Sequence, residues 1–208
     1  MILTGKVKVG SRIIRDPEFP LSEPYPPIRV EGRSVQKGAK VYFMMHKPKG
    51  VVTTRSDERG RKTVYNLLDE GLPNIFPVGR LDKESSGLLL LTNDTAWGNR
   101  ITAPESKLPK TYHVKLTGIV PEDALERLRK GFSHDGVSYL PVSVEKIRER
   151  EKSCWVEIVL REGKNRQIRK MFAGLGYEVE NLVRIKIGKL PLGNLKPGET
   201  RSIAPSDV

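Results

Sequence analysis

Gly79-Arg80-Leu81-Asp82-Lys83-Glu84-Ser85-Ser86-Gly87 is a charged loop between two glycines, and it runs directly into the apolar stretch Leu88 to Leu91. The apolar stretch is typical of a buried strand, so the loop lies at a sheet edge. An acid flanked by bases on such a loop suits an ionised, presented carboxylate at Asp82, because neighbouring cations favour the anion. The alternative is an ordinary turn with surface salt bridges. The serines lack the G-x-S-x-G spacing of a hydrolase nucleophile, which argues against that class.

Outward from this loop, strands outnumber helices and do not alternate with them regularly. The periodicity predicts strands over 41–45, 88–91, 112–116, 155–161 and 177–187. Capping residues, charges and glycines predict helices over 63–68, 95–100, 121–131 and 165–175. This pattern indicates an α+β fold rather than a doubly wound sheet.

The amino-terminal segment is expected to be a small β-rich unit. Val7 and Val9 pair with Ile13 and Ile14 around the turn Gly10-Ser11, as in a hairpin. A proline-rich loop and a short strand over 28–30 follow. Because the segment has few apolar residues, it either docks on the main domain or is ordered by RNA. We therefore divide the chain into residues 1–37 and 38–208.

The composition is that of a basic globular protein. Among 208 residues, 37 Lys and Arg oppose 25 Asp and Glu, a net charge of +12. Such an excess favours a nucleic-acid partner, although solubility alone would also explain it. The sequence shows neither a membrane-spanning run nor the apolar core of a signal peptide, and its one cysteine fits a reducing compartment, so we expect a cytoplasmic protein. One cysteine and three histidines argue against a zinc site.

A second cluster of charge occupies residues 161–172. On the predicted helix, Arg166, Arg169 and Lys170 share one face. Cations near a helix N-terminus are unfavourable, so an anionic partner would offset that cost. A phosphate and the carboxylate of Asp82 are both candidates, and a solvated basic face is the alternative.

Two further residues allow more than one interpretation. Tyr112, in Lys110-Thr111-Tyr112, is either a core residue or a platform on which an unstacked base lies. Cys154 lies on one strand face with Val156 and Ile158, which favours a buried structural thiol.

Taken together, these segments resemble the RsuA-like family of ribosomal RNA pseudouridine synthases. The matching pieces occur in family order from about Lys40 to Arg201. They are His46-Lys47-Pro48-Lys49-Gly50, the segments 79–94 and 110–112, Glu162-Gly163-Lys164-Asn165-Arg166-Gln167-Ile168-Arg169-Lys170-Met171, and the segment 181–190. The resemblance implies a mixed, mainly antiparallel sheet flanked by helices, with a central active-site cleft.

The resemblance also implies a mechanism. A uridine leaves its stack, its glycosidic bond to nitrogen breaks, and the base rejoins the ribose through carbon-5. Asp82 is then the essential carboxylate, acting either by attack on the anomeric carbon or through a glycal. Arg169 is the basic partner that pairs with it. Tyr112 packs against the flipped base and can act as a base toward the ribose, and Leu182 forms a wall of the uracil pocket.

The remaining implied residues contact RNA, with Arg80 filling the vacated stack or touching the flanking phosphate. The others are Lys83, Lys110, Lys164, Asn165, Arg166, Gln167, Lys170 and Arg184. No metal or cofactor is expected. We expect a monomer acting on ribosomal RNA or a partly assembled subunit, with 104–109 and the proline-rich loop helping to select the uridine. A non-catalytic ribosomal RNA-binding or assembly protein on the same scaffold is the competing hypothesis.

The segment from Gly5 to Arg33 resembles the second half of an alpha-L RNA-binding domain. The helical first half is not present in this sequence. From this we expect either a truncated form of the domain or a start codon placed late.

Overall fold

The computed structural model describes residues 1–22, 24–35, 38–69, 71–72 and 74–208. The chain forms two compact units, Met1–Ala39 and Lys40–Val208. The boundary that we expected from the sequence falls after Lys37, which, like Gln36, lies outside the described residues.

The first unit is a four-stranded antiparallel sheet in the order β2-β1-β3-β4. Its strands are β1 (Val7–Val9), β2 (Arg12–Ile14), β3 (Ile28–Val30) and β4 (Arg33–Ser34). Val7 lies opposite Ile14 and Val9 opposite Arg12, so the predicted hairpin around Gly10 is confirmed. Among the described residues of this unit only Ile14 is buried, which agrees with its small apolar content.

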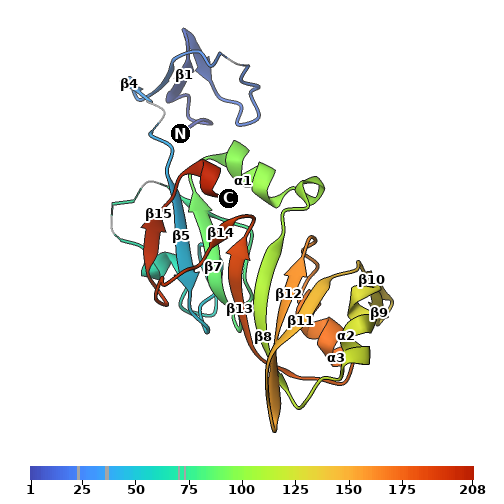
Figure 1. Cartoon of the computed structure of the whole chain (residues 1–208). Coiled ribbons are helices and arrows are strands. Elements are labelled where there is room, and N and C mark those ends of the chain that lie inside the picture. The colour runs from blue at the N-terminus through green and yellow to red at the C-terminus, as the bar shows by residue number, and fades with distance from the viewer. Residues whose placement is uncertain (23, 36–37, 70, 73) are drawn as a thin grey trace. The chain divides into compact units, whose positions relative to one another are not determined.

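The second unit is built on a nine-stranded sheet whose main path runs β11-β12-β8-β13-β7-β5-β15 (Figure 1). Strand β14 pairs with β13, and β6 pairs with β7. The pairing of β13 with β7 is parallel, and the other pairings in this sheet are antiparallel. The bounds are β5 (Tyr42–Lys47), β6 (Phe76–Val78), β7 (Ser86–Thr92), β8 (Lys110–Thr117), β11 (Ser143–Arg150), β12 (Ser153–Leu160), β13 (Val179–Ile187), β14 (Leu190–Pro191) and β15 (Thr200–Ser202).

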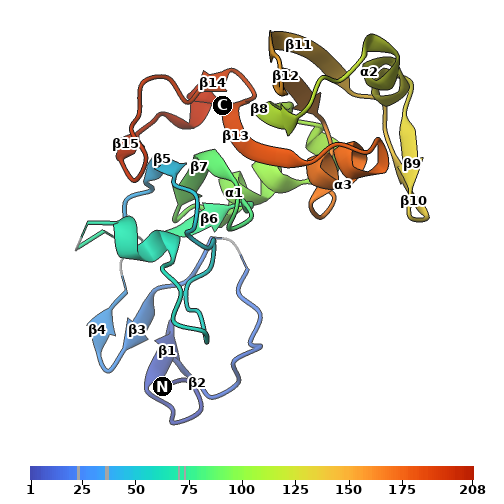
Figure 2. The ribbon, with the colours of Figure 1, turned by 90° about the horizontal axis from the view of Figure 1, so that it is seen from below.

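Short helices and one small hairpin complete the unit. The hairpin pairs β9 (Phe132–His134) with β10 (Val137–Tyr139) and lies with α2 (Glu122–Arg129) and α3 (Gln167–Gly174) at the β11–β12 end of the sheet (Figures 1 and 2). The other helices are α1 (Thr95–Thr102), η1 (Val64–Leu67), η2 (Pro104–Ser106) and η3 (Pro205–Asp207). Within the described ranges, no helix is both long and apolar enough to cross a membrane. The expected α+β fold with a mixed, mainly antiparallel sheet is confirmed.

Strand β7 explains why the sheet has a core on each face. Successive side chains of a strand point to opposite faces. Leu89 and Leu91 therefore join the core that includes α2 and α3, whereas Leu88 and Leu90 join a second core with Trp97 of α1. All four leucines are fully buried, as a strand between two covered faces requires.

Three details of the secondary structure differ from the predictions. Asp94, not Thr95, caps α1, because its side chain accepts a bond from the amide of Trp97. Arg166 adopts a left-handed conformation before α3, so it lies outside the helix and does not share a helical face with Arg169. Strand β11 was not predicted, because its sequence is mostly charged and its side chains are largely exposed.

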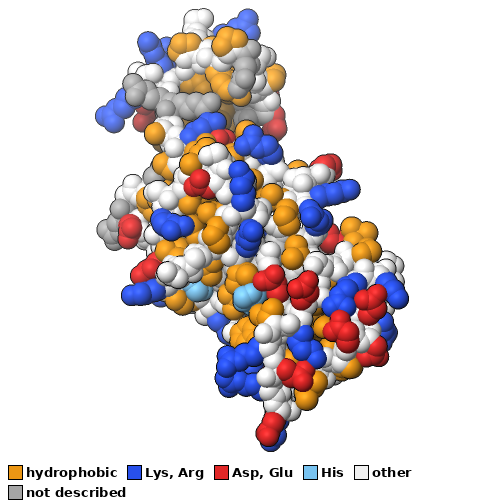
Figure 3. All heavy atoms as spheres, in the orientation of Figure 1, with side chains coloured by type: hydrophobic (Ala, Val, Ile, Leu, Met, Phe, Trp, Pro, Cys, Tyr) orange, Lys and Arg blue, Asp and Glu red, His pale blue; other side chains and the backbone are white. Residues whose placement is uncertain are grey.

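The charged side chains of the second unit can be followed over one of its faces in Figure 3. On the face shown in Figure 3, Lys and Arg side chains are scattered rather than gathered into one patch. Acidic side chains lie among them at the end formed by β11, β12 and α2. The net charge therefore does not by itself locate a binding surface.

Candidate active site

The loop that carries Asp82 connects β6 to β7 and is held by its backbone. All five carbonyl oxygens from Leu81 to Ser85 accept a hydrogen bond. The donors, in order, are the Thr53 hydroxyl at 2.9 Å, the Ser85 amide at 3.0 Å, the Gly50 amide at 2.8 Å, Arg169 Nη2 at 2.9 Å and Lys47 Nζ at 2.7 Å. Four of these donors come from outside the loop, so β5, the segment after it and α3 together fix its conformation.

The carboxylate of Asp82 is left uncommitted by this arrangement. Its side chain is half-buried, and no residue in the described part of the chain forms an ion pair or hydrogen bond with it. Burial lowers the pKa of both Lys47 and Arg169, and the negative charge of Asp82 opposes that lowering in each. A carboxylate with free oxygens and two cations in its vicinity is available to a substrate.

Lys47 is a site residue that our sequence analysis did not single out. Its side chain is 0 % exposed at the end of β5, and Nζ donates to the carbonyls of Pro48 and Ser85. Burial lowers the pKa of Lys47 to about 8, against the opposing effects of Glu84 and Asp82. The signal in the sequence was a lysine at the end of an apolar strand, directly before a proline.

Arg169 fixes the loop rather than pairing with Asp82. From the first turn of α3, Nη1 donates to the Val179 carbonyl and Nη2 to the Glu84 carbonyl, both at 2.9 Å. The expected ion pair with Asp82 is absent among the described residues, and Arg169 Nε is buried there without a partner. Burial is the main cause that lowers the pKa of Arg169, and the charge of Arg166 adds to it. The guanidinium thus ties the Asp82 loop to the start of β13.

Tyr112 and Leu182 lie in the same apolar core as Leu81, beside the Asp82 loop. Both are buried, Tyr112 on β8 and Leu182 on the adjacent β13. Tyr112 pairs across the strands with Arg184, which in turn lies opposite Gly87 at the start of β7. The register therefore brings the predicted apolar side chains to the part of the sheet where the loop enters.

Gly87 cannot be replaced without moving this junction. Its φ is +106°, and a Cβ built on it would lie 2.2 Å from the Arg184 carbonyl oxygen. Arg184 itself is 4 % exposed, and its Nε donates to the Leu88 carbonyl at 2.7 Å. Arg184 is therefore buried in the sheet, with Nη2 lacking a hydrogen-bond partner among the described residues, and its expected contact with RNA stays a prediction.

The basic segment before α3 combines structural and exposed residues. Gln167 is 3 % exposed, donates to Glu162 and accepts from the Lys164 amide, so its side chain holds the segment together, and its expected contact with RNA stays a prediction. Lys164 is paired with Glu162 and lies over the Tyr139 ring. Asn165, Arg166 and Lys170 are exposed. Only these three residues of the segment combine exposure with a lack of any such pairing in the described structure.

Lys110 lies beside the buried Arg184 and is half-buried. Its Nζ donates to the Leu108 carbonyl at 3.1 Å. The pKa of Lys110 is lowered first by burial and then by the charge of Arg184. A phosphate could reach this ammonium only from its open side.

A pocket of about 440 Å³ opens beside Asp82. One wall is formed by Arg80 to Lys83 and the other by the segment from Val52 to Arg61. The described residues contain no group of three or more His, Cys, Asp or Glu side chains arranged to hold a metal ion. The pocket therefore offers a free carboxylate, exposed cations and hydroxyl groups.

Comparison with known proteins accounts for this arrangement. Residues 41–174 match the model of the RNA pseudouridylate synthase family. The ribosomal large subunit pseudouridine synthase B of Bacillus subtilis is 33% identical over 100% of this chain and 86% of its own length. An uncharacterised RNA pseudouridine synthase of Rickettsia prowazekii is 39% identical, covering 98% of this chain and 86% of that protein.

The fold agrees with the sequence match. A solved structure of a pseudouridylate synthase superposes with a TM-score of 0.77 and 31% identity, covering 99% of this chain and 88% of the other. The family model covers the Asp82 loop with β5, β7 and β8 but ends before β13, whereas the two relatives match 98% or more of this chain. This chain is an enzyme that belongs to the RNA pseudouridylate synthase family.

Proposed function

We propose that this enzyme isomerises one uridine of ribosomal RNA to pseudouridine, with Asp82 as the essential carboxylate. The observation that carries the proposal is the contrast within the Asp82 loop. Every carbonyl from Leu81 to Ser85 is bonded, while the Asp82 carboxylate is free at the edge of a pocket. The name of the Bacillus subtilis relative supports ribosomal RNA as the substrate class and makes the large-subunit RNA the first to test.

The reaction assigns a task to each part of the site. The uridine must leave its stack to reach a carboxylate on the floor of a pocket. The bond from C1′ to N1 then breaks, the base turns, C5 bonds to C1′, and the proton of C5 is lost while N1 gains one. Asp82 either attacks C1′ or assists departure of the base through a glycal, and both roles use the anion. No electron is transferred to or from the substrate, so the step needs no redox cofactor.

The neighbouring side chains bind and orient the substrate in this proposal. Tyr112 packs against the flipped base, and Leu182 forms an apolar wall beside it. Arg80 and Lys83 are exposed on the pocket wall and contact the flanking phosphates. Arg169 and Lys47 keep Asp82 in place through the backbone and supply positive charge near it. A fixed carboxylate in a fixed field avoids reorganisation during the reaction.

We further propose that the protein works as a cytoplasmic monomer on ribosomal RNA or a partly assembled subunit. The first unit would add affinity for RNA, because Lys6, Lys8, Arg12, Arg29 and Arg33 stud its small sheet and turns. Its contribution is electrostatic and therefore falls steeply with salt.

The test is to incubate the pure protein with unmodified large- and small-subunit ribosomal RNA and to map pseudouridines by carbodiimide-stop primer extension. We expect one new site with the wild type and none with Asp82→Asn, which removes the charge with little change of shape. The rate should fall by roughly 10³-fold or more. A new site that Asp82→Asn also makes would remove Asp82 from its role. Tight binding without any new site would contradict the proposed reaction.

A further inference from the structure

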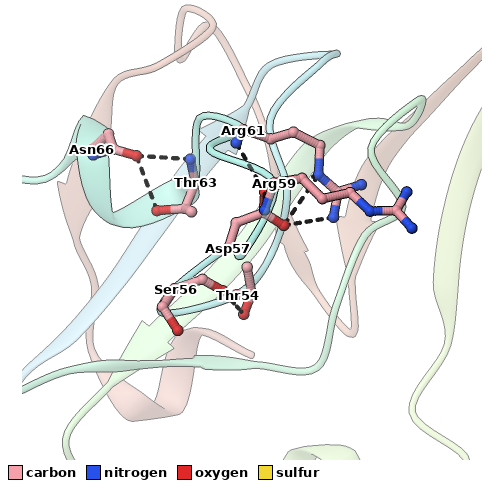
Figure 4. Close-up of polar contacts among 7 residues, drawn as sticks. All are labelled: Thr54, Ser56, Asp57, Arg59, Arg61, Thr63 and Asn66. Carbon is pink, nitrogen blue, oxygen red and sulfur yellow. Dashed lines mark hydrogen bonds and ion pairs between the residues drawn. The ribbon is translucent and has the colours of Figure 1, made fainter.

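The pocket wall opposite Arg80 and Lys83 is a loop organised around Asp57. The Asp57 carboxylate accepts hydrogen bonds from the amides of Arg59 at 3.1 Å and Arg61 at 2.9 Å. It also forms an ion pair of 2.5 Å with the Arg61 guanidinium (Figure 4). Asp57 is 6 % exposed, and the Arg61 side chain lies over it. The carboxylate of Asp57 thus holds the loop together, and the guanidinium of Arg61 is engaged in the ion pair with it.

Hydrogen bonds hold the two ends of this loop together and join its first end to Leu81, the residue before Asp82. The Val52 amide donates to Lys62 and the Val64 amide to Val52, and Thr63 with Asn66 caps the following turn of helix (Figure 4). Thr53 both donates to the Leu81 carbonyl and accepts from the Leu81 amide. The loop and the residue before Asp82 are therefore directly linked, so a contact made by the loop has a defined position relative to Asp82.

Arg59 is the residue that this loop presents. In Figure 4 its side chain runs beside that of Arg61 and extends beyond it, and no dashed line reaches its guanidinium. Arg59 is exposed and lines the pocket, and its side chain has no ion pair or hydrogen bond among the described residues. The same holds for Arg80 and Lys83 on the opposite wall.

Three uncommitted cations, Arg59, Arg80 and Lys83, therefore line one concave site that also holds the acids Asp82 and Glu58. A protein that needed them only for solubility would have no reason to collect them in a pocket beside a free carboxylate. Like charges brought together repel unless an anion lies between them. In RNA the phosphates flanking a flipped nucleotide supply anions on both sides of the base.

We propose that Arg59 binds a phosphate of the substrate RNA from the wall opposite Arg80 and Lys83, and that Asp57 and Arg61 are positioning residues that present it. This inference rests on the proposed function, because it concerns the same pocket and the same RNA. Arg59 and Arg80 then hold the backbone on the two sides of the target nucleotide. Since Thr53 links the Arg59 loop to Leu81, the phosphate contact lies at a defined position relative to the Asp82 loop and contributes to binding of the RNA.

The test is a single-turnover assay on the ribosomal RNA that the wild type modifies, at several salt concentrations. Arg59→Gln is compared with Arg148→Gln, which removes the same charge from the exposed strand β11 at the far end of the strand order. For Arg59→Gln we expect the half-saturating protein concentration to rise about fivefold, with the saturated rate near that of the wild type. The slope of log affinity against log salt should fall by about 0.7 to 0.9.

The phosphate contact would be overturned if Arg59→Gln kept the half-saturating concentration and the salt slope of the wild type. It would also be overturned if Arg148→Gln changed both quantities as much as Arg59→Gln does. Absence of pseudouridine with the wild-type protein would instead be a failure of the proposed function. The two failures are distinguishable because the first is measured only on an active wild type.

A double-mutant cycle tests the positioning role of Asp57. If Asp57 acts by presenting Arg59, then Asp57→Asn should weaken half-saturation in the wild type but add little to Arg59→Gln. Effects that multiply independently would overturn this role. Arg61→Gln keeps the amide bonds to Asp57, so it is a milder second variant that should shift half-saturation in the same direction should Asp57→Asn fold poorly.

Discussion

Two aspartates line the same pocket, and they have opposite relations to the chain around them. Asp57 uses its side chain to hold its loop, and its carboxylate is bonded to two amides and to Arg61. Asp82 lies on a loop that is held mainly through its backbone carbonyls, with one side-chain ion pair between Lys49 and Glu84, and its carboxylate has no partner within the described ranges. The two acids share a residue type and a pocket, and they differ in the partners of the carboxylate and of the backbone. That difference is the ground on which we propose Asp82 as the reactive acid.

The largest effect that would break this comparison comes from Arg169. Arg169→Ala removes the bonds to the Glu84 and Val179 carbonyls and the charge near Asp82. We expect the saturated single-turnover rate to fall by roughly 10²-fold with a much smaller change in half-saturation. Lys170→Ala, the exposed neighbour on α3, is the matched control and should leave the rate nearly unchanged. A loss confined to RNA binding would make Arg169 a phosphate contact instead.

Lys47 offers a test by pH of how the Asp82 loop is held, because its buried ammonium donates a hydrogen bond to the Ser85 carbonyl of that loop. The folded pKa of Lys47 is about 8, below its ordinary value of 10.5. Between these values the unfolded chain binds the proton and the folded chain does not, so stability rises with pH. Below pH 8 both states are protonated, and the cost of the buried charge is fully present.

We therefore expect the wild type to gain up to about 3 kcal/mol relative to Lys47→Met between pH 8 and 10.5, measured by urea unfolding. Lys49→Met, at an exposed neighbouring lysine, should show no such gain. A difference between wild type and Lys47→Met that stays constant with pH would show that Lys47 titrates normally.

The smallest effect is on the Asp57 loop, where stability also rises with pH, but in the acid range. Arg61 holds the pKa of Asp57 at about 2, below its ordinary value of 3.8. Stabilisation by the ionised carboxylate is present above about pH 4 and is lost as the pH falls toward 2. Asp57→Asn should lower the thermal midpoint at pH 7, and the difference from the wild type should shrink at low pH. Glu58→Gln, at an exposed acid in the same pocket, is the control, and an equal shift there would contradict the assignment.

Local patterns in the sequence predicted the elements that depend on local chemistry. The hairpin around Gly10, the strand over 88–91 and the helix that opens at Pro121 follow from turn residues, apolar runs and charges near helix ends. The cap of α1 was wrong by one residue because Asp94 and Thr95 are both good caps, and only the observed bond to Trp97 distinguishes them. Strand β11 was not predicted because an edge strand with charged, exposed side chains lacks the alternation of apolar and polar residues that indicates a strand.

The long-range contacts of the site could not be predicted in the same way. Asp82 and Tyr112 were singled out by local pattern and received their roles, as Leu182 did, from the resemblance to a family. The donors to the Asp82 loop, however, come from residues 47, 50, 53 and 169. Nothing in the residue type says that Lys47 is buried or that Arg169 bonds to carbonyls rather than to Asp82. Arg184 and Gln167 were assigned to RNA through the resemblance, and here sheet pairing and side-chain bonds bury them, although polar residues are usually exposed.

The central claim is that Asp82 reacts while Asp57 holds structure. It is tested most directly by measuring, for Asp82→Asn and Asp57→Asn, both the saturated single-turnover rate on unmodified ribosomal RNA and the thermal midpoint. We predict that Asp82→Asn abolishes pseudouridine formation with an unchanged midpoint, and that Asp57→Asn lowers the midpoint while keeping most of the saturated rate. The reverse pattern, with activity lost through Asp57 and retained without the Asp82 carboxylate, would contradict the account.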